Sequence, residues 1–220
     1  MKKGIIFDLD GTLWDSSKQV VEAWNRAIAQ STYERKPLTM MDMQHVMGKT
    51  MDVIAEILFP DLELEKRTAL LDACCLEEND YLRRHGGVLY PGVAETMKQL
   101  TESGYHLYMV SNCQSGYIEA FLDYYKLWDL VEDIECYGNN HKQKGENIAL
   151  VIKRNQLEET AYVGDIQGDY DATMAAGEIL GQNVTFVHAA YGFGTIVQKV
   201  KRIEAFQELT QLFPISYNKN

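Results

Sequence analysis

The chain has 220 residues, 46% hydrophobic and 24% charged, with a formal net charge of −11. This length allows a full hydrophobic core, either in one domain with a large insertion or in two modest domains. The acidic balance argues against binding to nucleic acids and to anionic membrane surfaces. No apolar stretch reaches the length of a membrane span, so we expect a cytoplasmic protein. A monomer is the default expectation.

The first predicted element is a strand that ends in an acidic motif. Residues 4–7 form an apolar run without alternation, which is typical of a central strand covered by helices on both faces. Asp8-Leu9-Asp10-Gly11-Thr12 follows directly. In parallel α/β sheets, ligands bind where the strands end at their carboxyl side. The motif therefore indicates a catalytic site.

The two carboxylates of this motif indicate a metal. In extended backbone Asp8 and Asp10 would lie on the same side, roughly 6–7 Å apart. Since neighbouring carboxylates repel, keeping both ionised calls for a cation, and hard oxygen ligands suit Mg²⁺. Exposed amides in the Gly11 turn would favour a phosphate. The alternative is that both aspartates only begin a turn and cap the next helix.

Residues 16–86 contain helical patterns and no convincing strand. Ser16 or Ser17 can cap the first helix, Thr39 with Asp42 resembles a capping box for the second, and Thr50 can start the third. The longest helical pattern runs over 64–84 and is closed by two glycines. We predict an all-helical cap domain over 16–86, inserted into a core domain of 1–15 and 87–220.

From Val88 onward strands and helices alternate, as in a parallel sheet. Strands are expected over 105–110, 133–137, 161–163 and 184–188, and helices over 92–102, 115–125, 146–155, 169–176 and 195–212. The last helix would pack through Ile196, Val200, Ile203 and Phe206, within an aromatic-rich tail from Tyr191 to Tyr217. The predicted fold class is α/β: a doubly wound parallel sheet, Rossmann-like, with an inserted all-helical cap.

Polar residues follow the later strands as they follow the first. Ser111 and Asn112 come after 105–110, and Lys142 and Lys144 precede the helix expected at 146. Gly164-Asp165 and Asp169 come after 161–163. Each group alone could be a turn, a helix cap or a solvated surface pair. The order of all these groups along the chain indicates a catalytic site more specifically than any one group does alone.

These motifs resemble those of the haloacid dehalogenase-like hydrolase superfamily. Its phosphatases carry Asp-x-Asp-x-Thr, then Ser or Thr, then Lys, then Gly-Asp-x-x-x-Asp, which here match 8–12, Ser111, Lys144 and 164–169. The helical insertion resembles the cap of the phosphoglycolate phosphatase-like branch, so the resemblance covers nearly the whole chain. Many relatives have Lys-Pro-x-Pro at the third motif, and this chain has no proline there, so Lys142 stays an alternative.

The resemblance implies a Mg²⁺-dependent phosphatase acting on a small-molecule phosphate ester. It implies Asp8 as the nucleophile that becomes an aspartyl phosphate and Asp10 as the general acid and base. Mg²⁺ would be held by the Asp8 side chain, the Asp10 carbonyl and Asp165, with Asp169 orienting the ligands. The remaining implied site residues bind the phosphoryl group or substrate: Ser111 and Lys144 as catalytic groups, and Thr12 and Asn112 as substrate-binding groups.

Substrate choice is expected to lie in the cap. Residues 46–50 resemble the cap loop that reaches the active site in relatives, making Lys49 either a contact for an anionic leaving group or a solvated lysine. By resemblance, phosphoglycolate is the best single substrate candidate, with sugar phosphates and nucleotides open.

Two rival functions share parts of this site. A phosphomutase of the β-phosphoglucomutase type has the cap and the Asp-x-Asp motif, but those mutases resemble Glu-Asp at the fourth motif with a later glycine, unlike Gly164, Asp165 and Asp169 here. A phospho-acceptor signalling module also combines an acceptor aspartate, Mg²⁺, a hydroxyl and a lysine. Asp10 and the cap argue against it, because a long-lived phosphoryl switch gains nothing from an adjacent base.

Overall fold

A parallel sheet forms the centre of the core. A computed structural model describes residues 2–214, within which six strands form the main sheet in the order β5-β4-β1-β6-β7-β8. The strands are β1 (Lys3–Phe7), β4 (His106–Ser111), β5 (Asp133–Cys136), β6 (Glu159–Gly164), β7 (Val184–Ala189) and β8 (Lys201–Ile203). All neighbouring pairs are parallel. The predicted central position of the first strand is confirmed.

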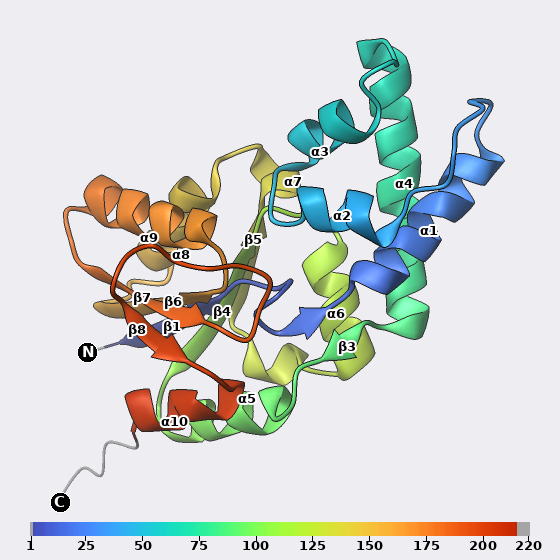
Figure 1. Cartoon of the computed structure of the whole chain (residues 1–220). Helices are drawn as coiled ribbons and strands as arrows, with labels where there is room; N and C mark the ends of the chain where they lie inside the picture. Colours follow the sequence, from blue (N-terminus) through green and yellow to red (C-terminus); the bar gives the residue numbers. More distant parts are fainter. Residues whose placement is uncertain (1, 215–220) are drawn as a thin grey trace, which may run out of the picture.

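Helices cover both faces of the sheet, and the alternation of side chains along the strands explains why (Figure 1). Ile5 and Phe7 are buried in one apolar cluster, which includes α5 (Val93–Glu102) and α6 (Tyr117–Tyr125). Ile6 is buried in the other cluster, with α8 (Lys144–Arg154) and α9 (Gln167–Leu180). A strand buried on both faces has no polar side, so its sequence reads as a continuous apolar run.

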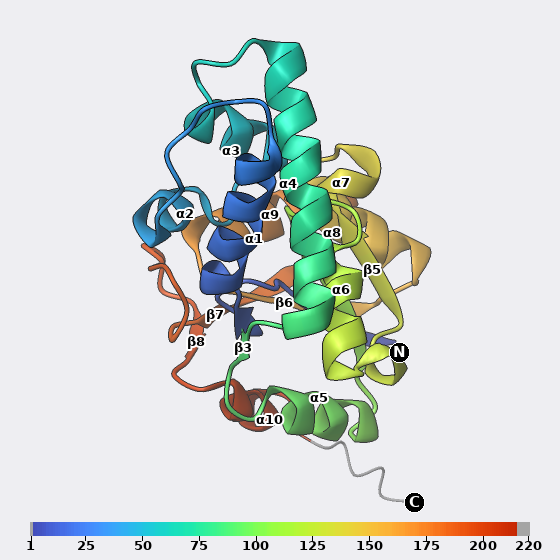
Figure 2. The same cartoon turned by 90° about the vertical axis from the view of Figure 1, so that its right-hand side faces the viewer.

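Four helices between β2 and β3 stand beside the sheet as a separate group (Figures 1 and 2). They are α1 (Ser17–Gln30), α2 (Met40–Val46), α3 (Met51–Leu58) and α4 (Leu64–His85). The capping box of Thr39 and Asp42 is confirmed, and α3 begins after Thr50 as predicted. Ser16 occupies the N-cap position of α1, but its side chain makes no capping hydrogen bond.

The two chain crossings between the helical group and the sheet pair with each other. β2 (Trp14–Asp15) and β3 (Val88–Leu89) form a short antiparallel ladder that the sequence did not predict. A Cβ at Gly87 would lie 2.8 Å from Trp14 Cε3 and 3.0 Å from the Asp15 carbonyl oxygen. A side chain at this position would clash with these atoms. Gly87 therefore lets the two chain crossings pack closely against each other.

The helix predicted over 195–212 is wrong. The segment contains β8, the 3₁₀ turn η2 (Phe206–Glu208) and the short helix α10 (Leu209–Leu212). Ile196 and Val200 pack against one apolar cluster of the sheet, whereas Ile203 and Phe206 belong to the other. One helix face could not reach both sides of a sheet, so the apolar spacing was misread as helical. Tyr217 lies outside the described residues.

Other differences are local. Tyr137, predicted as the end of a strand, begins the short helix α7 (Tyr137–Asn140), which follows the 3₁₀ turn η1 (Trp128–Leu130) and β5. Helices α8 and α9 each begin two residues before their predicted starts at 146 and 169. Lys144 and Asp169 therefore both lie in the first turns of helices. Within the described part of the chain, no helix has the length and apolar character needed to cross a membrane.

Candidate functional site

Three neighbouring strand ends bring the predicted site residues together. Asp8 follows β1, Ser111 ends β4, and Asp165 follows β6. β1 lies between β4 and β6, so the three carboxyl ends meet at one edge of the sheet. The Asp8 amide still donates to the Val163 carbonyl at 2.9 Å, which anchors the start of the motif to β6.

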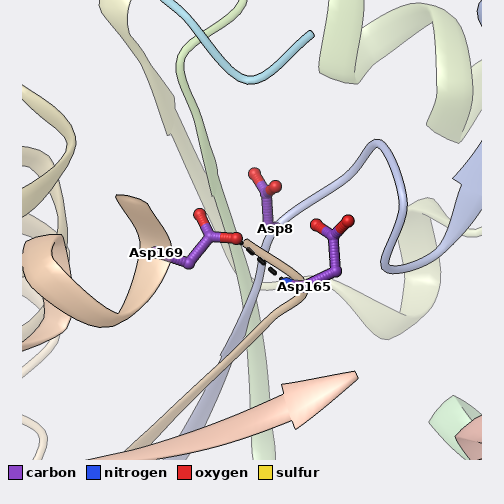
Figure 3. A group of neighbouring side chains, drawn as sticks. All are labelled: Asp8, Asp165 and Asp169. Carbon is purple, nitrogen blue, oxygen red and sulfur yellow. Dashed lines mark hydrogen bonds between the residues drawn. The ribbon is translucent and has the colours of Figure 1, made fainter. Parts of the chain in front are cut away.

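Three buried carboxylates gather at this edge. Asp8, Asp165 and Asp169 each offer one oxygen atom, and these atoms all lie within 4.8 Å of one another (Figure 3). Burial raises the pKa of both Asp8 and Asp165, and the charge of Asp169 raises each pKa further. The cluster therefore favours a cation that would neutralise it.

Lys144 supplies one positive charge to the cluster. Its Nζ donates to Asp8 Oδ1 at 3.0 Å and to Asp169 Oδ1 at 2.6 Å. The two carboxylates raise the pKa of Lys144 although burial opposes this, so the side chain stays an ammonium. Lys142, the alternative in the sequence, is exposed, and of the two lysines the structure brings Lys144 to the carboxylates.

Asp169 is held by backbone amides as well as by Lys144. Its Oδ2 accepts from the amides of Asp165 and Ile166 at 3.0 and 3.1 Å, and Figure 3 shows the first of these bonds as a dashed line. Both oxygens of Asp169 thus already have donors. These donors fix the orientation of the Asp169 carboxylate beside Asp8 and Asp165.

Asp165 is held in a close-fitting turn. Its Oδ2 accepts from the Phe193 amide at 2.7 Å, and Thr12 Oγ1 lies 3.5 Å from its Oδ1. Gly11 has φ +78°, and a Cβ there would lie 2.1 Å from Asp165 Oδ2. The glycine of the opening motif is therefore needed for backbone conformation and for space. The predicted substrate-binding residue Thr12 is fully buried at this point, beside the metal-ligand candidate.

The donor set fits a hard divalent cation. The candidate ligands are carboxylate oxygens in a buried cluster, and no thiol or imidazole is among them in the described part of the chain. Oxygen donors of this kind suit Mg²⁺ or Ca²⁺ better than zinc or copper. The Asp10 side chain is not part of this cluster among the described residues.

Asp10 has different surroundings from Asp8. Its Oδ1 accepts from Ser16 Oγ at 2.6 Å and from the Tyr117 hydroxyl at 2.8 Å. Burial raises the pKa of Asp10 to about 6, and the two hydroxyl donors oppose that rise. A carboxyl group with a pKa near neutrality can both give and take a proton, which is the requirement for a general acid and base.

Sequence reasoning missed the support for Asp10. Ser16 was predicted only as a helix cap, and its hydroxyl is committed to Asp10 instead. Tyr117 comes from α6, 107 residues away along the chain. No local pattern marks it, because only the packing of α6 beside the first crossing brings its hydroxyl to Asp10.

A cavity of about 50 Å³ lies between this edge of the sheet and the helical group. The core contributes Asp8, Asp10, Ser111, Asn112, Cys113, Gln114 and Tyr117, and the helical group contributes Val20, Trp24, Met43, Met47, Gly48, Lys49, Met51, Ile54 and Glu78. Asn112 Nδ2 donates to the Gly48 carbonyl at 3.0 Å, which joins the loop after α2 to the core. Lys49 lines the cavity but is exposed.

Glu78 is a buried carboxyl group in the wall of this cavity. Trp24 Nε1 donates to its Oε2, and burial raises the pKa of Glu78 to about 8. Sequence reasoning missed this residue, although a signal existed. Leu70, Cys74 and Leu82 form a buried stripe of α4 at four-residue spacing, and Glu78 occupies the position in that stripe between Cys74 and Leu82.

Comparison with known proteins identifies relatives over most of the chain. Residues 5–179 match the family described as haloacid dehalogenase-like hydrolase. A phosphoglycolate phosphatase of Aliivibrio fischeri is 29% identical over 189 residues, covering 80% of this chain and 81% of the relative. A phosphoglycolate phosphatase of Pseudomonas putida is 25% identical over 203 residues, covering 86% and 70%.

Solved structures share the fold. A haloacid dehalogenase-like family hydrolase of Streptococcus pneumoniae superposes with a TM-score of 0.73 at 19% identity, over 97% of this chain and 98% of that one. A hydrolase of Pseudomonas syringae gives a TM-score of 0.70 at 19% identity, over 94% and 96%. These matches include both the sheet and the helical group.

Proposed function

The chain belongs to the haloacid dehalogenase-like hydrolases, and from this we propose that it is a Mg²⁺-dependent phosphatase that hydrolyses a small phosphorylated metabolite. One observation carries the proposal: the Lys144 ammonium joins Asp8 to Asp169 at the strand ends where Asp165 also lies. A phosphoryl group brought there would meet a nucleophile, a fixed positive charge and a metal-binding carboxylate. The relatives named phosphoglycolate phosphatase support the same reaction class.

In the first proposed step, an oxygen of the Asp8 carboxylate attacks the phosphorus atom. The bond from phosphorus to the leaving oxygen breaks, and Asp10 gives its proton to that oxygen. Asp8 is then an aspartyl phosphate, and the alcohol leaves. Ser111, the Asn112 amide and Lys144 would bind the transferring phosphoryl oxygens, so that positioning and charge stabilisation supply most of the catalysis.

In the second proposed step, Asp10 is ionised and accepts a proton from a water molecule. The water oxygen attacks phosphorus, the bond to Asp8 breaks, and inorganic phosphate leaves with both aspartates restored. The Ser16 and Tyr117 hydroxyls hold one oxygen of Asp10, which leaves the other to exchange the proton. When bound by Asp8, Asp165 and the Asp10 carbonyl, Mg²⁺ would neutralise charge on the phosphoryl oxygens.

The same proposal divides the chain into two parts. We take residues 1–15 and 87–220 as the catalytic core and 16–86 as a cap that encloses the leaving group and excludes water. The cavity walls support this division, because the residues around the leaving-group position come from α1, α2, α3, α4 and the loop after α2. The names of the relatives make phosphoglycolate the best single substrate candidate by resemblance.

The test is a phosphate-release assay over many phosphorylated metabolites with Mg²⁺, run beside Asp8→Asn. We expect release from at least one substrate by the wild type, loss of release on chelation, and no release by the variant. Equal release by both proteins would show that Asp8 is not the nucleophile. A stable aspartyl phosphate without release of inorganic phosphate would indicate a signalling module instead.

A further inference from the structure

The segment between β7 and β8 lies against the candidate metal ligands, although it supplies none of them. It covers residues 190–200 and forms neither helix nor strand. Three consecutive residues of this segment, Tyr191, Gly192 and Phe193, lie against both parts of the chain that carry the proposed ligands. We call residues 191–193 the strap. The proposed chemistry gives the strap no role.

Tyr191 holds the turn of the opening motif. Its hydroxyl donates to the Thr12 carbonyl at 2.7 Å, and this bond joins residues that are 179 positions apart along the chain. The turn has its own backbone bonds, since the amides of Thr12 and Leu13 donate to the Leu9 carbonyl at 3.2 and 2.8 Å. Those bonds fix the shape of the turn. The Tyr191 bond adds an anchor from outside it.

Phe193 holds the carboxylate of Asp165. Its backbone amide donates to Asp165 Oδ2 at 2.7 Å. His188, near the end of β7, donates from Nε2 to the Asp165 carbonyl at 3.2 Å. The side chain of Asp165 is therefore fixed by the strap, and its backbone is fixed by the strand that leads into the strap.

Gly192 lets the strap approach both segments at once. A Cβ at this position would lie 2.3 Å from the Gly11 carbonyl oxygen and 2.4 Å from Asp165 Cβ. Gly192 is not among the residues with positive φ, so the glycine is needed for space and not for backbone conformation. Because atoms in close-packed regions cannot overlap, a larger residue would push the strap away from one segment or both.

We propose that the strap sets the spacing between the opening turn and Asp165, and that Tyr191 is a positioning residue for the Mg²⁺ site. This inference rests on the proposed function, in which the Asp10 carbonyl and Asp165 hold Mg²⁺. Asp10 lies two residues before Thr12, so a turn that loses its Tyr191 anchor also loses the fixed position of the Asp10 carbonyl. Groups that orient metal ligands from behind typically change metal affinity by about 10–100-fold.

Tyr191→Phe tests this role with Mg²⁺ alone, without substrate. The variant loses the hydroxyl but keeps the ring contact with Tyr90, whose centroid lies 4.9 Å away. Mg²⁺ is titrated by calorimetry into the full chain after treatment with a chelator. We expect the Kd for Mg²⁺ to rise about tenfold. The Tm of the metal-free chain should fall by only about 2–4 °C, as for the loss of one hydrogen bond.

Tyr90→Phe is the matched control. Its ring packs against Tyr191, and in the part of the chain that the structure describes its hydroxyl makes no hydrogen bond. The control should keep the Kd for Mg²⁺ within about twofold of the wild type.

Gly192→Ala tests the strap through its backbone. It keeps the Tyr191 hydroxyl, but its Cβ needs the space now occupied by the Gly11 carbonyl and Asp165. The Kd for Mg²⁺ should rise at least as much as in Tyr191→Phe. If Gly192→Ala does not fold, Tyr191→Phe still decides the inference.

Activity gives a second measurement that a purely structural role would not match. Tyr191→Phe lacks metal affinity but no catalytic group, so saturating Mg²⁺ should restore its kcat for phosphate release to within about twofold of the wild type. A structural defect predicts a loss of kcat that does not depend on Mg²⁺.

The outcomes separate this inference from the proposed function. An unchanged Kd in Tyr191→Phe, an equal rise in Tyr191→Phe and Tyr90→Phe, or a loss of kcat that saturating Mg²⁺ does not restore would overturn the role of Tyr191. A wild type that binds Mg²⁺ but releases no phosphate from any ester would overturn the phosphatase and leave the strap's role to the Mg²⁺ titrations. A wild type that binds no Mg²⁺ would overturn both.

Discussion

Lys144 lies between two carboxylates that would repel each other without it. Its ammonium reaches Asp8 and Asp169, which are 136 and 25 residues away along the chain. The family resemblance favoured Lys144 over Lys142, but the missing prolines of the third motif left Lys142 as an alternative. Burial decides between them physically, because a buried ammonium persists only where carboxylates surround it.

Replacing Lys144 by Met should lower kcat/KM by at least about a hundredfold, since it removes a fixed positive charge from the phosphoryl site. Lys142→Met is the matched control, and this exposed residue should change kcat/KM by less than about twofold. Steady-state phosphate release with Mg²⁺ measures both. Equal losses in the two variants would contradict the assignment of Lys144.

Tyr117 should set the pH dependence of the first chemical step. Its hydroxyl stabilises ionised Asp10, so Tyr117→Phe should raise the Asp10 pKa above about 6. The step needs protonated Asp10 as the acid, and the variant would retain that proton to higher pH. The alkaline limb of the kcat/KM profile should therefore move upward by up to about one pH unit.

Tyr125→Phe is the control for this prediction. Tyr125 lies on the same helix, and its hydroxyl donates to the Gly87 carbonyl at 2.9 Å rather than to Asp10. The control profile should coincide with that of the wild type. A shift of the Tyr117→Phe limb toward lower pH would show that the hydroxyl does not favour the ionised carboxylate.

At the scale of secondary structure, local patterns predicted the central elements well and the last segment poorly. The apolar runs that became β1, β4, β6 and β7 mark strands because burial on both faces removes polar positions. The segment after β7 was misread because four apolar residues at near-helical spacing serve two opposite faces of the sheet. Periodicity reports spacing, but it does not report which surface each residue meets.

The capping box of α2 gives a prediction at this scale. Thr39 Oγ1 accepts from the Asp42 amide at 3.3 Å, and the Thr39 amide donates to Asp42 Oδ2 at 2.8 Å. Thr39→Ala should cost about 1 kcal/mol of stability and lower Tm by about 2–4 °C. Thr39→Ser retains the hydroxyl and should melt near the wild type by circular dichroism. If the serine variant melts like the alanine variant, the cap is not the cause.

At the scale of the whole molecule, the acidic cluster joins segments that lie far apart along the chain. Asp8 follows the first strand, and Asp165 and Asp169 come more than 150 residues later. Their mutual repulsion and burial oppose folding in the absence of a cation. A metal that binds only the folded arrangement therefore stabilises the protein as a whole.

Millimolar Mg²⁺ should raise the Tm of the wild type by several degrees, because saturating a site to about 100 times its Kd adds roughly 2.7 kcal/mol. Asp165→Asn removes one proposed ligand and should abolish most of this rise. Asp171→Asn, an exposed change on the same helix α9, should keep it. Calorimetry with and without Mg²⁺ checks this, and an undiminished rise in Asp165→Asn would remove Asp165 from the metal site.

The sequence by itself determined which residue types follow each strand and in what order, and these sufficed for the family, the α/β class and the candidate catalytic aspartates. Strand patterns, glycines and caps are local, so a linear sequence displays them. Only the tertiary structure decided that Tyr117 holds Asp10, that Lys144 joins Asp8 to Asp169, and that Glu78 lines the cavity beside Asp8 and Asp10. These contacts depend on how α4, α6 and α8 pack against the sheet edge, which no local pattern encodes.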